Sequence, residues 1–234
     1  MTRAFVIGNG PSLTSDQLNL IHKNEDVSFG VNRIHLIYPE TKWRPTNWVI
    51  MDFSNSIFYK EDIEFHSRQG YPCYLRNDIA AKYIEGCIPV FPNKERVTPL
   101  TDNLYIIDSC GHIDSERFTS DGWHEDDPAI ICKMGGSVPA AIQMAVKWGH
   151  NPIYLIGMDG NKRGNAENNF IAGYIHIDAV GVQKAAIANR TTELALTIAH
   201  GECNSRGVKL LDATVGGSAY HHALDRVDFY KLFV

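Results

Sequence analysis

Four short polar clusters follow apolar runs in this sequence, and their side chains suit the binding of a phosphate or a sugar. They are GNGPS at residues 8–12, GVNR at 30–33, MDFS at 51–54 and GMDG at 157–160. Each places a glycine, an amide, a hydroxyl or a carboxylate where a hydrophobic run stops. Polar groups that converge in this way predict a pocket for a nucleotide or a sugar.

The first cluster combines a glycine turn with the start of a helical pattern. Gly8 and Gly10 permit positive φ or a close approach of another backbone, and Ser12 or Thr14 is suited to cap the helix. Free N–H groups at such a turn attract anions. We therefore predict that Gly8, Asn9, Gly10 and Ser12 contact the phosphate or ribose of a ligand, so that Gly10→Val blocks binding and leaves the fold intact. An ordinary tight turn explains GNG equally well, because the third glycine of the dinucleotide-binding fingerprint is missing.

Two further stretches carry candidate binding residues. GGS at residues 135–137 opens a helical pattern and offers a second helix N-terminus to an anion. The segment at about 160–178 is rich in glycine and asparagine and follows a predicted strand, which is typical of a lid. Its Lys162 and Arg163 supply positive charge for a phosphate. We expect this lid to order over a bound ligand. His176, beside Asp178 in this segment, is either a catalytic histidine or a surface histidine with a carboxylate partner.

Length and composition limit the classes of protein to which this chain can belong. The 234 residues suit one domain, residues 1–234, with a lid. A net charge of −5 argues against a general nucleic-acid or anionic-membrane binder, and the five scattered cysteines predict reduced core thiols. No apolar run is long enough to span a membrane and no signal peptide precedes the first strand, so we expect a cytoplasmic protein. The sequence leaves the oligomeric state open.

Apolar runs alternate with helical patterns along the chain. The predicted strands include AFVIG, VSFGVNRI, NWVIMD, CIPVFP, NLYIID, PIYLIGMD and GVKLLDAT. Helices are predicted at residues 137–148 and about 182–203. Such alternation predicts an α/β fold with a Rossmann-like, mostly parallel sheet and helices on both faces. The polar clusters would then meet at the carboxyl edge of the sheet.

Several of these motifs together resemble a known family. VIGNGPSL, VNRI, GGSVPAAIQMAVKWGHNPIYLIGMD and GYIH occur in an order and spacing similar to the glycosyltransferase family 42 sialyltransferases. They look equally similar to the related domain-of-unknown-function 115 group, which includes archaeal 6-hydroxymethylpterin diphosphokinases. The motif DATVGGS near the C-terminus favours the resemblance to that second group. The likeness runs from Phe5 to about Ala219, except for residues of about 59–131.

The resemblance implies a nucleotide-binding transferase and gives roles to individual residues. His176 falls at the base that deprotonates the acceptor hydroxyl, Asp159 at an aspartate that ends a strand in both groups, and Asp52 at an asparagine near the donor sugar. The favoured interpretation is a glycosyltransferase that joins a nucleotide-activated sugar to a small-molecule or glycan acceptor without a required cofactor. Its catalytic residues would be His176 and Asp159. The positions that bind the cytidine nucleotide in the sialyltransferases correspond here to Asn9, Ser12, Asn32, Gly136 and Ser137.

The lid departs from the sialyltransferase pattern, and this departure keeps two alternatives open. Sialyltransferases stabilise the leaving phosphate with two lid tyrosines, whereas here Lys162 and Arg163 follow the strand and the first tyrosine is Tyr174. One alternative is a diphosphokinase that transfers diphosphate from ATP, with Asp52 and Asp159 around Mg²⁺. The other is a nucleotide-binding protein without catalysis.

Overall fold

The computed structural model describes residues 2–51, 60–76, 99–101, 104–110, 123, 130–132, 136–159, 170–171, 174, 182–216 and 224–234. The strands in these ranges are β1 (Ala4–Ile7), β2 (Val27–Val31), β3 (Asn47–Ile50), β4 (Cys73–Arg76), β5 (Pro99–Thr101), β6 (Leu104–Cys110), β7 (Ile130–Cys132), β8 (Ile153–Ile156) and β9 (Leu210–Asp212). The helices are α1 (Ser15–Lys23), η1 (Asn32–Glu40), α3 (Lys60–Arg68), α5 (Ser137–Lys147), α6 (Val182–Ser205) and η4 (Tyr230–Phe233).

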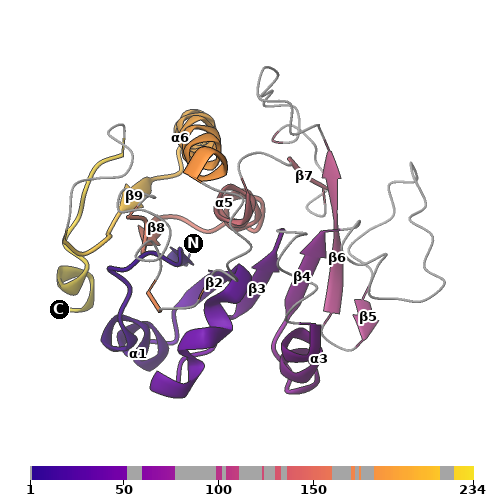
Figure 1. Ribbon diagram of the computed structural model, residues 1–234. Helices are drawn as coiled ribbons and strands as arrows, with labels where there is room; N and C mark the ends of the chain where they lie inside the picture. The colour runs from indigo at the N-terminus through magenta and orange to yellow at the C-terminus, as the bar shows by residue number, and fades with distance from the viewer. Residues whose placement is uncertain are drawn as a thin grey trace.

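The strands form one sheet in the order β5-β6-β4-β3-β2-β1-β8-β9, with β7 beside β6 (Figure 1). The pairings are parallel apart from the antiparallel pairing of β5 with β6. Parallel neighbours need crossover connections. Among the described elements, α1, η1, α3 and α6 lie in the connections β1–β2, β2–β3, β3–β4 and β8–β9. The chain therefore has the Rossmann-like α/β fold that the sequence predicts.

Successive side chains of the buried strands point to opposite faces, so the sheet separates two hydrophobic clusters. Ala4 and Val6 of β1 pack with α5 and α6 on one face. Phe5 and Ile7 pack with α1, η1 and α3 on the other face. Figure 1 shows α5 and α6 on one side of the sheet and α1 and α3 on the opposite side. This three-layer packing leaves the carboxyl ends of the strands as the edge where a site can form.

The structure decides between the two helix caps that the sequence allows. Thr14 caps α1, because its side chain accepts a hydrogen bond from Gln17 N–H and the Gln17 side chain accepts one from Thr14 N–H. The predicted run CIPVFP lies outside the described residues. The sequence analysis predicts neither the strand β4 nor the helix α3.

Two other expectations from the sequence are met within the described part of the chain. Cys73 and Cys203 are free, buried thiols, and burial raises the pKa of each to about 12. No described helix combines the length and the apolar character that crossing a bilayer requires.

An aromatic cluster that contains two histidines lies beneath the sheet. His35 of η1 packs 5.3 Å from the ring of Trp48, and His66 of α3 lies 5.6 Å from the same ring. Burial, helped by the charge of Arg33 and by His66, lowers the pKa of His35 to about 3. The Asp62 carboxylate lies 3.4 Å from His35 Nε2 but is half exposed, so water weakens its attraction. His35 is therefore neutral in the folded protein at ordinary pH.

We predict that this histidine makes the protein less stable in mild acid. The unfolded chain takes up a proton at His35 near its ordinary pKa of about 6.5, whereas the folded protein does so only near pH 3, so stability is fully present above pH 6.5 and falls below it. At about pH 5 the loss is about 2 kcal/mol. Denaturant unfolding across this pH range should show a shallower pH dependence for His35→Gln than for wild type. The exposed His22 provides the control variant His22→Gln, and equal slopes for both variants would contradict the prediction.

Candidate functional site

The order of the sheet reverses between β1 and β8, because β2, β3 and β4 lie on one side of β1 and β8 and β9 on the other. In open α/β sheets, ligands bind outside the carboxyl ends of the strands at such a switch point. Ile7 at the end of β1 pairs in register with Ile156 at the end of β8. The turn at residues 8–12 and the turn at residues 157–159 therefore lie side by side, and two of the predicted polar clusters meet.

These two turns pack backbone against backbone. A Cβ atom on Gly8 would lie 2.6 Å from Gly157 O, and a Cβ atom on Gly157 would lie 2.6 Å from Gly8 O. A Cβ atom on Gly10 would lie 2.0 Å from Asp159 Oδ2. The expectation that Gly10→Val leaves the packing of this region intact is not met, because the added side chain would collide with the neighbouring turn. The effect of Gly10→Val on ligand binding stays a prediction.

The N–H groups of the first turn are largely used within the protein. Gly8 N–H donates to Ile156 O at 2.8 Å and Gly10 N–H to Gly157 O at 2.9 Å. Ser12 donates to Asp159 Oδ2 through both its N–H, at 3.1 Å, and its Oγ, at 2.7 Å. The Asp159 carboxylate thus occupies the place at the turn that a bound anion would take. Of the predicted backbone donors, these three are already paired.

Asn9 connects the turn to β2 and to the predicted lid. The side-chain Nδ2 of Asn9 donates to Val31 O at 3.0 Å and lies 2.6 Å from the hydroxyl of Tyr174. The backbone carbonyl of Asn9 accepts a hydrogen bond from Phe170 N–H at 3.0 Å. A carbonyl such as Val31 O only accepts, and this fixes which side of the amide faces it. Asn9 Oδ1 is buried and has no hydrogen-bond partner among the residues that the structure describes. A ligand with a hydroxyl or amino donor would relieve that deficit.

Arg33 and Tyr174 hold the described part of the predicted lid against the end of β2. The Arg33 guanidinium donates to Tyr174 O and lies 5.5 Å from the centroid of the Tyr174 ring. Arg33 N–H also donates to the Tyr174 hydroxyl at 3.3 Å. The sequence analysis includes Arg33 in the GVNR cluster and in the VNRI motif but assigns it no individual role.

Asn32 and Ser137 lie together although they are far apart in the sequence. Ser137 Oγ donates to Asn32 Oδ1 at 2.6 Å and accepts from Met51 N–H at 3.1 Å. Asn32 adopts a φ of 47°, a conformation that asparagine tolerates better than most residues, and its carbonyl accepts from Trp48 Nε1 at 2.7 Å. Gly136, which precedes α5, has a φ of 101° with open space where a Cβ would be. Gly136 is therefore exposed beside this pair, whereas Ser137 itself is buried.

The remaining predicted site residues lie outside the described part of the chain. They are Asp52, Lys162, Arg163 and His176. Within the described ranges, no group of three or more histidine, cysteine, aspartate or glutamate side chains is arranged to hold a metal ion. A Mg²⁺ site at Asp52 and Asp159 thus stays a prediction.

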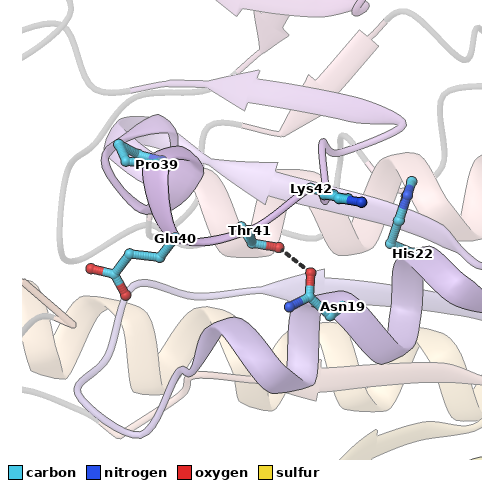
Figure 2. A pocket seen from close by; sticks show the side chains of 6 residues that line it. All are labelled: Asn19, His22, Pro39, Glu40, Thr41 and Lys42. Atoms are coloured by element: carbon cyan, nitrogen blue, oxygen red, sulfur yellow. Dashed lines mark hydrogen bonds between the residues drawn. The ribbon is translucent and has the colours of Figure 1, made fainter.

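A surface cavity of about 530 Å³ lies elsewhere, between α1 and the end of η1 (Figure 2). Both elements lead from there to the amino ends of β2 and β3, the edge opposite to the switch point. In Figure 2, Asn19 and Thr41 face each other, and Thr41 Oγ1 donates to Asn19 Oδ1 at 2.7 Å. Its lining mixes Glu40 with Lys42 and shows no buried unpaired group that would favour a ligand.

Comparisons with known proteins place the fold. Neither a protein-family model nor a curated protein matches the sequence. The MAf glycosyltransferase from Magnetospirillum magneticum AMB-1 aligns with a TM-score of 0.54 and 13% identity over 98% of this chain, which spans 34% of that protein's chain. A CMP complex of the sialyltransferase CST-II aligns with a TM-score of 0.46 and 14% identity over 91% of this chain and 81% of that one. The chain therefore has a fold found in a glycosyltransferase.

We predict that a side chain at Gly10 destabilises the protein by forcing the two turns apart. Gly10→Ala should lower the free energy of unfolding by about 1–3 kcal/mol, the usual range for overpacking. Gly201 lies in α6, where an added Cβ would meet nothing within 4 Å, so Gly201→Ala should be neutral or stabilising by up to about 1 kcal/mol. Denaturant unfolding of both variants measures the difference. A Gly10→Ala protein as stable as wild type would contradict the packing argument.

Proposed function

We propose that this protein is a glycosyltransferase that binds a nucleotide-activated sugar at the carboxyl ends of β1, β2 and β8. The observation that carries the proposal is the convergence of polar side chains at the switch point: Asn9 follows β1, Asn32 follows β2 and Ser137 opens α5. Many α/β proteins bind nucleotides at the carboxyl ends of their strands, at such a switch point. The fold shared with the MAf glycosyltransferase supports the class of enzyme.

In this proposal the two amide side chains bind the nucleoside and the start of α5 binds the phosphate. Amides both donate and accept hydrogen bonds, which suits a base or a ribose. The first N–H groups of a helix lack partners within the helix, and Gly136 leaves room for a ligand in front of them. The start of α5 is favoured over the glycine turn because the N–H groups of Gly8, Gly10 and Ser12 already have acceptors.

The proposed reaction transfers the sugar to an acceptor hydroxyl. A bond forms between the hydroxyl oxygen and the anomeric carbon, the bond from that carbon to the phosphate oxygen breaks, and the phosphate keeps the electron pair. His176 takes the proton of the acceptor as a general base. Lys162 and Arg163 neutralise charge on the leaving phosphate, and Asp159 holds Ser12 and thereby the shape of the site.

The resemblance to sialyltransferases favours a cytidine nucleotide, and a thermal-shift screen tests this. Among CMP, CDP, UDP, GDP and ATP, we expect CMP to raise the Tm most, since a ligand that binds only the folded state stabilises it. Asn9→Ala should weaken CMP binding roughly 5- to 30-fold, which corresponds to about 1–2 kcal/mol for a lost hydrogen-bonding group.

The control for this variant is Asn24→Ala, because Asn24 lies exposed at the end of α1 and its side chain donates only locally, to Leu20 O at 2.8 Å. Its Kd for CMP should equal that of wild type. An unchanged Kd in Asn9→Ala would remove Asn9 from the site. A shift seen only with ATP and Mg²⁺ would contradict the glycosyltransferase proposal.

The catalytic part of the proposal predicts that His176→Ala lowers turnover by roughly two to four orders of magnitude with little loss of donor binding, as expected for removal of a general base. Turnover should persist in EDTA, because protein groups alone stabilise the leaving phosphate. His22→Ala, at an exposed histidine beside the distant cavity, is the matched control and should keep full turnover. A His176→Ala enzyme with near-normal kcat would show that the acceptor loses its proton by another route.

A further inference from the structure

The turn at residues 157–159 is also held from the side of β9. Thr214, two residues after β9, accepts a hydrogen bond from Met158 N–H through its Oγ1 at 3.1 Å. Thr214 N–H donates to Asp212 Oδ1 at 2.9 Å. Thr214 is 6% exposed and Asp212 is 3% exposed, so water does not compete for these bonds. The Thr214 hydroxyl therefore fixes the residue that precedes Asp159.

Arg226, in the C-terminal segment, contacts both Thr214 and Asp212. Its Nη2 atom donates to Thr214 O at 2.7 Å and to Gly216 O at 2.9 Å. Its Nε lies 3.5 Å from Asp212 Oδ2. A buried carboxylate needs a compensating cation, and Arg226 supplies one to Asp212. Backbone bonds from Asp212 N–H to Asp225 O and from Val227 N–H to Asp212 O keep the segment beside β9.

We infer that Arg226, Asp212 and Thr214 are positioning residues that fix Met158 and Asp159 and, through the Asp159 carboxylate, the Ser12 turn. The connection passes across the ends of three neighbouring strands, from β9 to β8 to β1. Its consequence is that contacts made by the C-terminal segment set the geometry of the donor site and hence its affinity for nucleotide. That consequence rests on the proposed function, whereas the positioning of Met158 does not.

A purely structural contact would lower stability without altering the turn, so the test needs a local readout. Thr214→Val keeps the shape of the side chain and removes only the acceptor of Met158 N–H. The Met158 amide should then exchange with solvent roughly tenfold faster or more, because a buried N–H loses its partner. Exchange at Ile156 in β8 serves as the internal reference for global unfolding.

Matched variants distinguish the loss of the Thr214 hydroxyl from the general effect of a substitution. Thr214→Ser retains the acceptor and should restore exchange at Met158 to the wild-type rate. Thr197→Val removes a hydroxyl on the exposed face of α6 that donates to Glu193 O at 3.0 Å, and it should leave exchange at Met158 unchanged. Arg226→Met should accelerate exchange at Met158 as Thr214→Val does, while Arg206→Met, which breaks a pair with Glu202 on α6, should not.

Nucleotide affinity is measured on the same proteins with CMP as the probe. We expect Thr214→Val to weaken binding several-fold and Thr214→Ser to bind like wild type. An unchanged exchange rate at Met158 in Thr214→Val overturns the positioning role, and faster exchange with an unchanged Kd overturns its consequence for the donor site. If wild-type protein binds no nucleotide, the proposed function fails while the exchange rates still decide whether Thr214 positions the turn.

Discussion

The contact between the turns that follow β1 and β8 is the constraint on which the candidate site depends. Gly8 and Gly157 meet backbone to backbone, and Asp159 accepts both hydrogen bonds from Ser12. This contact requires glycine at the ends of two strands and fills the anion position of the first turn with the protein's own carboxylate. In the proposed function, the phosphate is therefore assigned to the start of α5, beside Gly136, and not to the first turn.

The candidate site at the carboxyl edge of the sheet also depends on the aromatic cluster that packs on the face covered by η1 and α3. Trp48, packed against His35 and His66, donates through Nε1 to the carbonyl of Asn32. That bond, together with the bond from Ser137, holds Asn32 in a left-handed conformation that an isolated residue seldom adopts. Packing of the aromatic cluster thus sets the direction in which a candidate nucleotide-binding side chain points.

The shared fold and the site carry different kinds of information. The likeness to the MAf glycosyltransferase, at 13% identity, is a likeness of architecture, and architecture alone supports many chemistries. Function has to be read from the groups at the switch point, where Asn9, Asn32 and Ser137 converge from separate elements. The contacts of Phe170 and Tyr174 with the β1 and β2 ends show that part of the predicted lid meets these groups directly.

The sequence by itself predicts the order of the main elements. Apolar runs separated by helical patterns predict β1, β2, β8, β9, α5 and α6, because the residues that an element buries recur with the period of that element. The same pattern places Asn9, Ser12, Asn32 and Ser137 at strand and helix ends on one edge of the sheet. How these groups are used follows from the tertiary structure alone. The glycines serve the contact between turns, Asp159 binds Ser12 across 147 residues, and Tyr174 reaches Asn9 across 165. Such partners depend on distances between strands that are remote in the chain, and no local pattern records those distances.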